Sequence, residues 1–247
     1  MSSNNTVSAA LALPWATESI RWKRYDFHRS DASSASAYVL SRMRADILSA
    51  YFSPGSKLPL KVLMARYETS IMPIREALAV LCGAGLVLAE SQRGFRVAPA
   101  SRIDLLDLTE TRQRIEGMAL RLSIAHADRA WLNEVQDVAA AFARVSQKVG
   151  QDGPISDEWE ALHREFHFAL IARCGSPTLL NFCSQLHDRY DRYRRLVLPS
   201  KSYMAGVAGD HDEIKDAALL GDADRAVALL ERHIRLMSEV LLGQYVH

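Results

Sequence analysis

Nine residues, SIMPIREAL at positions 70–78, constrain the fold of this chain more than any other feature. A proline is tolerated in the first turn of a helix, because the N–H that it lacks would have no partner there. We therefore expect a helix over Met72–Gly83 with Ser70 as its N-cap. A shorter helix is expected over Leu60–Tyr67, and the residues Glu68-Thr69 would then form the turn of a helix-turn-helix.

The residues around this pair of helices extend the pattern. Upstream, Ala37–Ala50 carries its apolar side chains on one stripe, which predicts a helix. Downstream, Leu86–Glu90 and Phe95–Ala98 alternate in the manner of two strands joined by a short turn. The order predicts a winged helix-turn-helix over residues 34–99, whose second helix enters the major groove of DNA.

Such a module reads bases mainly through the first turns of its second helix. Arg75 is the best candidate base reader, because a guanidinium can grip O6 and N7 of guanine together; the alternative for Arg75 is a salt bridge on a solvated helix. Ile74 is expected on the same reading face. Residues of the first helix are expected at phosphates, and the glycine of the wing tip permits a close approach in the minor groove. The predicted DNA contacts are Lys61, Arg66, Ser70, Ile71, Met72, Arg75, Arg93 and Gly94.

Beyond a linker at residues 99–101, the chain is predicted to be helical throughout, so the fold as a whole is mainly α. A length of 247 residues suits two domains, and we place the second, all-α domain at 102–245, with Ser101 capping its first helix. Residues 1–33 are expected to form a mobile tail, in which Arg21–Tyr25 either contacts DNA or only aids solubility. The expected helices are Asp104–Ala127, Trp131–Val149, Asp157–Arg173, Thr178–Leu198, Val207–Leu220 and Asp222–Leu242.

The net charge of +1 conceals an uneven distribution. Residues 21–102 carry 13 Lys/Arg and 6 Asp/Glu, whereas residues 103–247 carry 17 and 22. A basic first part joined to an acidic second part indicates that only the first part meets a polyanion. The alternative is that the positive charge is scattered over a solvated surface.

The three cysteines form no CxxC pair, which fits a reducing compartment better than a disulfide framework. The apolar run Ala9–Leu13 is short and follows no basic segment, so we expect no signal peptide. No apolar run reaches the length of a membrane span. Together these features predict a cytoplasmic protein without membrane contact.

Four of the eight histidines are predicted to meet at one point. His163 and His167 are four residues apart and share one helix face. His211 and His233 would lie about 33 Å apart on a continuous helix, but an antiparallel hairpin at Gly221 brings both to a similar depth. Four imidazoles in a bundle core suit zinc, nickel or a similar borderline cation. The alternative is a set of unrelated histidines, some of them exposed.

A metal-dependent helical-bundle enzyme is the rival from another functional class. Glu160-x-x-His163 is half of a di-iron signature, which requires a second such motif and two further glutamates. Glu231-Arg232-His233 has the wrong spacing for that second motif. The chain also contains neither a glycine-rich phosphate loop nor a serine nucleophile elbow. We therefore expect no enzymatic activity.

Five short motifs in the winged region are Pro54-Gly55, Leu63-Met64, the run at 70–78, Gly85-Leu86-Val87 and Arg93-Gly94. With them, this region resembles the GntR family of bacterial transcriptional regulators. Ile71 and Met72 stand where that family has arginine and threonine, and Glu68-Thr69 replaces its Gly-Val. An apolar pair can contact a thymine methyl but loses a bidentate base reader. We therefore expect an operator that differs from the family's common one.

The motifs of the second half are His163-Arg164-Glu165-Phe166-His167, His211-Asp212-Glu213-Ile214, Gly221-Asp222 and His233. With them, residues from about Ile103 to Leu242 resemble the FCD ligand-binding domain of the FadR-like branch. This resemblance implies a divalent metal, most simply zinc or nickel, on His163, His167, His211 and His233. The family has aspartate at the position of His163, so four neutral imidazoles leave the metal charge uncompensated and favour an anionic ligand.

The resemblance also implies that Arg112 points into the cavity, where its forked guanidinium suits a carboxylate; a surface ion pair with Glu116 is the alternative. The expected function is then a regulator, commonly a repressor, whose affinity for double-stranded DNA responds to a small carboxylate effector near the metal. We expect a homodimer on a near-palindromic operator. The same regulator with a vestigial, metal-free pocket is the alternative. One member of a basic cluster is expected to point inward: Arg189, Arg192, Arg194 or Arg195.

Overall fold

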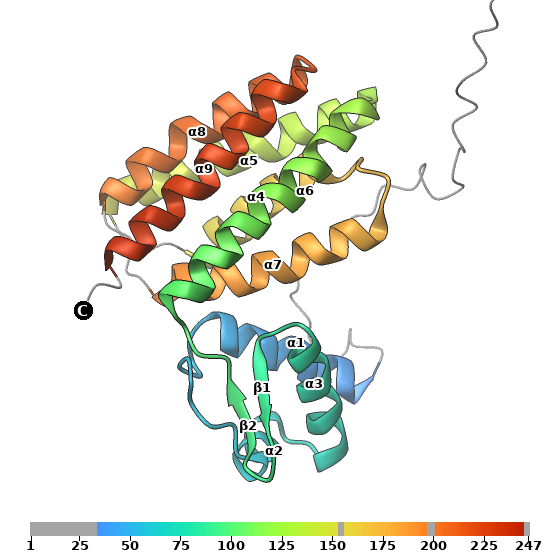
Figure 1. Ribbon diagram of the computed structural model, residues 1–247, viewed down its shortest axis with the longest axis vertical. Coiled ribbons are helices and arrows are strands. Elements are labelled where there is room, and N and C mark those ends of the chain that lie inside the picture. The colour runs from blue at the N-terminus through green and yellow to red at the C-terminus, as the bar shows by residue number, and fades with distance from the viewer. Residues whose placement is uncertain (1–33, 153–155, 197–200, 245–247) are drawn as a thin grey trace, which may run out of the picture.

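The computed structural model describes residues 34–152, 156–196 and 201–244. A small N-terminal unit with a two-stranded hairpin is joined to a larger helical unit by a short linker after the second strand (Figure 1). The predicted mainly α fold is confirmed. The predicted tail at 1–33, including Arg21–Tyr25, lies outside the described residues.

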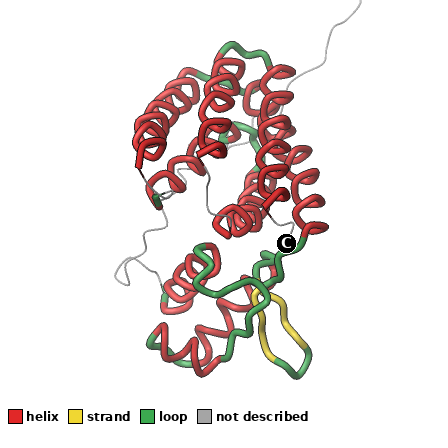
Figure 2. Tube along the Cα trace, turned by 90° about the vertical axis from the view of Figure 1, so that its left-hand side faces the viewer, coloured by secondary structure: helices red, strands yellow, loops and turns green. Residues whose placement is uncertain are grey.

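The N-terminal unit packs three helices beside a hairpin. Its elements are α1 (Ala35–Leu48), α2 (Leu60–Tyr67), α3 (Ile71–Gly83), β1 (Val87–Glu90) and β2 (Gly94–Val97). The strands are antiparallel, with Val87 opposite Val97, and the hairpin forms the wing (Figure 2). Met43, Leu63 and Leu78 come from different helices and are fully buried, so one apolar core holds the helix-turn-helix together.

Details of the turn before α3 differ from expectation. Glu68 ends α2 in the left-handed region, at φ 50°, where a side chain meets steric strain. Ser70 is the N-cap of α3 as predicted, but its side chain makes no capping hydrogen bond. The placement of Ile74 on the reading face was wrong. This side chain is fully buried because α3 turns it into the core, whereas Arg75 is exposed.

The C-terminal unit consists of α4 (Arg102–Ala125), α5 (Arg129–Asp152), α6 (Asp157–Ile171), α7 (Pro177–Leu196), α8 (Lys201–Leu219) and α9 (Ala223–Gln244). Ser101 caps α4 by accepting a 3.0 Å hydrogen bond from the Asp104 N–H, as predicted. Two boundaries were wrong by more than two residues, since α5 continues through Gly150 and α8 begins at Lys201. A glycine inside a helix costs only about 1 kcal/mol, which a long helix can absorb. Gly221, at φ 77°, makes the predicted turn between α8 and α9.

Two apolar clusters enclose a polar layer in the middle of this bundle. One cluster includes Phe166, and the other includes Phe142 and Trp159. The rings of Phe142 and Phe166 both contact His211 edge-on, at centroid distances of 5.0 and 5.1 Å. The layer of histidines is therefore shielded from solvent by aromatic rings. Among the described residues, no helix is both long and apolar enough to span a membrane.

Helix α7 lies along the border between the two units and contacts α1 (Figure 1). Arg192 is buried and donates to the backbone oxygen of Ala98 at 2.7 Å. The Tyr193 hydroxyl accepts a 3.1 Å hydrogen bond from the Ser101 N–H. The linker between the units is therefore tied to α7 on the side of the C-terminal unit.

Candidate metal and effector site and candidate DNA interface

The four predicted histidines meet in the core of the C-terminal unit. His163 and His167 come from α6, His211 from α8 and His233 from α9, and all four are buried. Each offers a ring nitrogen, and these nitrogens lie within 4.8 Å of one another. The hairpin at Gly221 places the His211 and His233 ring centroids 4.5 Å apart. The alternative of scattered, partly exposed histidines is wrong.

The electrostatics of the cluster favour neutral rings. Burial lowers the pKa of His163 and His167 well below its usual range, and the neighbouring cation and imidazoles lower it further. Burial also lowers the pKa of His233, although the nearby carboxylate of Asp210 opposes the effect. Metal coordination needs a neutral imidazole, so these rings are already in the required protonation state near pH 7.

The second nitrogen of a ligating histidine normally donates to an acceptor, which fixes the tautomer. His233 follows this rule, since its Nδ1 lies 3.3 Å from an Asp210 carboxylate oxygen. That contact leaves Nε2 of His233 with its lone pair free to bind a cation. The four clustered histidines thus offer a donor set that fits zinc or nickel, with Asp210 orienting one of them.

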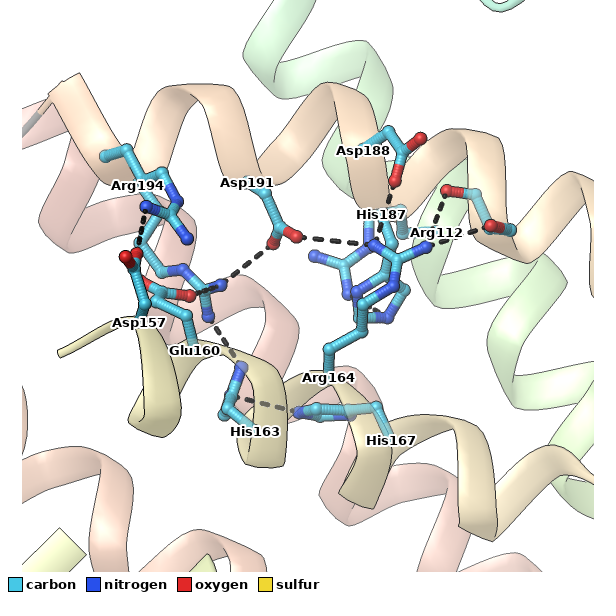
Figure 3. A network of polar contacts seen from close by, with 12 residues as sticks. Arg112, Asp157, Glu160, His163, Arg164, His167, His187, Asp188, Asp191 and Arg194 are labelled. Atoms are coloured by element: carbon cyan, nitrogen blue, oxygen red, sulfur yellow. Dashed lines mark hydrogen bonds and ion pairs between the residues drawn. The ribbon is translucent and has the colours of Figure 1, made fainter. Parts of the chain in front are cut away.

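His163 departs from the rule because an arginine faces its second nitrogen. Arg194 Nη1 lies 2.6 Å from Nδ1 of His163, and the same guanidinium forms ion pairs with Glu160 and Asp191 (Figure 3). A guanidinium only donates, so Nδ1 of His163 must accept. Nε2 then carries the proton and, 3.2 Å from Nε2 of His167, donates to it.

A second buried cluster lies beside the histidines, and its members are Arg112, Glu116 and His187. Arg112 donates to Glu116 through Nε at 2.6 Å, and Arg112 Nη2 lies 3.1 Å from Nε2 of His187. Burial alone would raise the pKa of Glu116, but Arg112 and His187 lower it to about 2. The ion pair of Arg112 with Glu116, which was the alternative to a role in the cavity, is therefore present, but it is buried rather than on the surface.

Arg112 and His187 of this cluster and His163 and His233 of the histidine cluster border one small cavity. Its lining includes Arg112, His163, Tyr190, Arg194 and His233. Its volume is about 10 Å³, close to the space that one water molecule needs. A larger ligand therefore requires side chains to move, and the two guanidiniums lie on the wall that it would meet.

Sequence reasoning missed several members of this site. His187 and Asp191 gave no motif, and Glu160 was considered only as half of a di-iron signature, because their burial depends on how α4, α6 and α7 cross. One arginine of the basic cluster was expected inside, but both Arg192 and Arg194 are buried. One sequence signal could have indicated these buried charges. Asp188, Asp191 and Arg194-Arg195 recur at helical spacing on a tyrosine-rich helix, so their charges share a face with apolar side chains.

The predicted DNA contacts lie on the N-terminal unit, and most of them are exposed. Ile71 and Met72 keep 39% and 59% of their surfaces accessible at the start of α3, an unusual exposure for large apolar side chains. The exposed predicted contacts are Lys61, Ser70, Ile71, Met72, Arg75, Arg93 and Gly94. Arg66 is instead half-buried and donates to the Asp46 carboxylate at 2.6 and 2.8 Å. Its guanidinium therefore pairs with Asp46 within this unit rather than facing DNA as predicted.

Comparison with protein families divides the chain at the same linker. Residues 36–97 match the bacterial regulatory proteins of the gntR family, and residues 107–236 match the FCD domain. The chain is 37% identical to BphR of Paraburkholderia xenovorans LB400, an uncharacterised HTH-type transcriptional regulator, over 198 residues covering 79% of this chain and 80% of BphR. It is 32% identical to the HTH-type transcriptional repressor GlaR of Escherichia coli K12 over 196 residues, covering 78% and 89%.

Solved structures share the fold at lower sequence identity. Escherichia coli McbR/YncC superimposes with a TM-score of 0.72 at 21% identity, covering 86% of this chain and 99% of that protein. A GntR regulator from Rhodococcus sp. RHA1 gives a TM-score of 0.67 at 21% identity, covering 85% and 98%. The winged unit and the helical bundle therefore recur together in these proteins.

Proposed function

Because the chain belongs to the GntR family of bacterial transcriptional regulators and carries an FCD domain, we propose that it is a cytoplasmic repressor controlled by a divalent metal and a small carboxylate. Regulators of this family bind DNA operators, and FCD domains bind small effectors. The expectation that the chain is not an enzyme is confirmed by its relatives. The cluster of four buried histidines, two of which share one cavity with Arg112, carries the proposal.

The DNA-binding surface that we propose is the exposed start of α3 together with the wing tip. Arg75 reads a guanine, Ile71 and Met72 lie against thymine methyl groups, and Arg93 enters the minor groove. Lys61 on α2 contacts a phosphate. One such module touches few bases, so we propose a homodimer with two half-sites in a near-palindromic operator.

The variant Arg75→Ala is expected to lower affinity for an operator selected from random DNA by about 1–3 kcal/mol and to relax one position of that operator. Lys61→Ala is the matched control, because it removes an exposed cation that we assign to a phosphate. Its affinity should fall for all sequences, with a flatter dependence on salt. Fluorescence anisotropy at several salt concentrations measures both effects. If Arg75→Ala binds DNA with unchanged affinity and specificity, the assignment of α3 to the DNA interface is wrong.

The metal site that we propose uses His167, His211 and His233, with His163 as the fourth ligand after its proton has moved to the other nitrogen. The metal supplies a positive charge that attracts a carboxylate. Asp210 orients His233 through the Nδ1 contact, and the aromatic rings around the cluster keep competing water out. The proposal is supported by four buried histidines whose ring nitrogens lie within 4.8 Å of one another.

Zinc added to protein that has been stripped with a chelator is expected to bind at one ion per chain and to raise the melting temperature. At a free zinc concentration 1,000 times the Kd, the gain is about 4 kcal/mol. His167→Ala should abolish the gain, whereas replacing the exposed His126 in His126→Ala should leave it intact. Atomic absorption and calorimetry are the measurements. If the wild-type chain gains stability from neither zinc nor nickel, the metal site is wrong and the alternative, a regulator with a metal-free pocket, remains.

The effector that we propose is a small carboxylate whose oxygens meet the metal and the Arg112 guanidinium. Arg112 is held by Glu116 in the cavity wall, so a ligand carboxylate must compete with that glutamate. The effector changes DNA binding only through different affinities for the two states of the dimer. Release from DNA is the direction that we expect for a repressor.

A thermal-shift screen of small carboxylates is expected to yield a stabilising ligand, and that ligand should then change operator affinity roughly 5–150-fold. Arg112→Lys keeps a charge beside Glu116 but loses the fork that suits a carboxylate, so ligand affinity should fall about tenfold or more. Arg114→Lys, on the exposed face of the same helix, is the control. Identical ligand binding by all three proteins would place the effector site elsewhere.

A further inference from the structure

The aspartates of α7 are each shared between two arginines. Asp188 accepts from Arg44 of α1, with Nε at 2.6 Å, and pairs with Arg164 of α6 at 2.9 Å. Asp191, one helical turn further on, pairs with the same Arg164 at 3.4 Å and with Arg194 at 2.9 Å. These five side chains form an unbroken ion-pair chain from the histidine cluster to the DNA-binding unit (Figure 3 shows all but Arg44).

The ion-pair chain lies largely out of solvent. Asp188, Asp191 and Arg194 each keep less than a tenth of their surfaces exposed. Charges in such surroundings interact more strongly than in water, and each depends on its partner because an unpaired buried charge is costly. When one of two arginines that share a carboxylate moves, the carboxylate must therefore change its position relative to the other arginine. The same holds for an arginine that is shared by two carboxylates.

The end of the ion-pair chain at the histidine cluster is sensitive to metal. A neutral imidazole has one nitrogen lone pair, and Arg194 occupies the lone pair on Nδ1 of His163. His163 can donate a lone pair to a metal only after its proton has moved from Nε2 to Nδ1. Two N–H donors would then face each other at 2.6 Å. Coordination by His163 and its contact with Arg194 therefore exclude each other.

The other end of the ion-pair chain reaches the DNA-binding unit directly. Arg44 lies near the middle of α1, which packs against the reading helix α3. Asp188 and Asp191 are both carried by α7, the same helix that holds the linker through Arg192. A displacement of Arg194 thus changes the charges around Asp191 and Arg164, and through Asp188 it changes the hold on α1.

We propose that metal binding at the histidine cluster is transmitted to helix α1 of the DNA-binding unit through the ion-pair chain Arg194–Asp191–Arg164–Asp188–Arg44. This inference rests on the proposed metal site and adds the route of regulation. Metal competes with Arg194 for His163, and the other four residues act as positioning residues that carry the displacement across the border between the two units.

Amide hydrogen exchange of peptides from residues 35–48, with and without zinc, tests this inference on the full chain. The wild type is expected to show a zinc-dependent change of about fivefold or more in exchange rate, the lower end of usual coupling. Asp188→Asn should abolish the change while its zinc affinity, measured by chelator competition, stays that of the wild type. Arg44→Gln, at the outer end of the ion-pair chain, is a second variant with the same expectation.

Arg189→Gln is the matched control. Arg189 neighbours Asp188 on α7, forms a 2.6 Å ion pair with Asp104, and its side chain lies against Gly85 of the N-terminal unit. The variant Arg189→Gln therefore removes one ion pair at the same border between the two units. Because Arg189 does not belong to the ion-pair chain, the zinc response of α1 should persist in this variant.

The outcomes separate the two levels of inference. Absence of zinc uptake by the wild type overturns the proposed metal site and this route with it. Zinc uptake without any change in α1 overturns the route alone. A full zinc response in both Asp188→Asn and Arg44→Gln also overturns the route, whereas its loss in these two variants and its persistence in Arg189→Gln support it.

Discussion

Acidification is expected to destabilise the metal-free chain steeply as the pH falls below about 6.5. Burial lowers the pKa of His163, His167, His187 and His233, so the folded chain keeps these rings neutral where the unfolded chain protonates them near pH 6.5. The unfolded state therefore binds more protons, and stability falls with falling pH. Each ring contributes up to about 1.4 kcal/mol per pH unit, so four rings contribute up to about 5.6 kcal/mol per pH unit.

Urea unfolding in the presence of a chelator, at pH values from about 8 to 5, measures this slope. His187→Gln should reduce the slope by the share of one ring, because it removes one buried imidazole outside the proposed metal ligands. His126→Gln is the matched control, since His126 is exposed. A wild-type stability that stays flat down to pH 5 would show that the histidines become protonated without unfolding and that the site admits water.

Glu116→Ala is expected to destabilise the C-terminal unit by about 3–5 kcal/mol, the usual cost of breaking a buried ion pair from one side. Glu116 and Arg112 are both buried, and the pKa of about 2 for Glu116 reports how strongly Arg112 and His187 hold its charge against the cost of burial. The sign follows from that lowered pKa. The contribution of Glu116 is complete above the ordinary glutamate pKa and is lost as the pH falls toward 2.

Helix α4 offers a matched control for this variant. Glu110 and Arg114 form an ion pair with the same spacing of four residues, but both side chains are exposed. Glu110→Ala should therefore change the free energy of unfolding by less than about 1 kcal/mol. The double variant Arg112→Leu/Glu116→Leu should recover most of the loss, because a buried ion pair is often replaceable by apolar residues. Equal effects of Glu116→Ala and Glu110→Ala in urea unfolding would contradict the buried assignment.

The winged unit could be predicted from the sequence because its signals are local. A proline fits the first turn of α3, and Gly85 and Gly94 occupy positions of positive φ around the wing. The helix α2 was predicted to the residue, while α3 and the two strands were shifted by one residue at most ends. The error at Ile74 arose because the choice between the reading face and the core depends on a rotation of α3 of about one residue, about 100°.

The sequence by itself determined the four histidines of the candidate site and the hairpin at Gly221, because a spacing of four residues and a glycine turn restrict where side chains can point. It could not determine what surrounds them. Arg194 reaches His163 across 31 positions of sequence, and Arg44 reaches Asp188 across 144. Such contacts depend on how α6 and α7 cross and on how the two units dock. The periodicity of one helix does not indicate which charged residue of another helix lies beside it. The ion-pair chain was therefore decided by the tertiary structure alone.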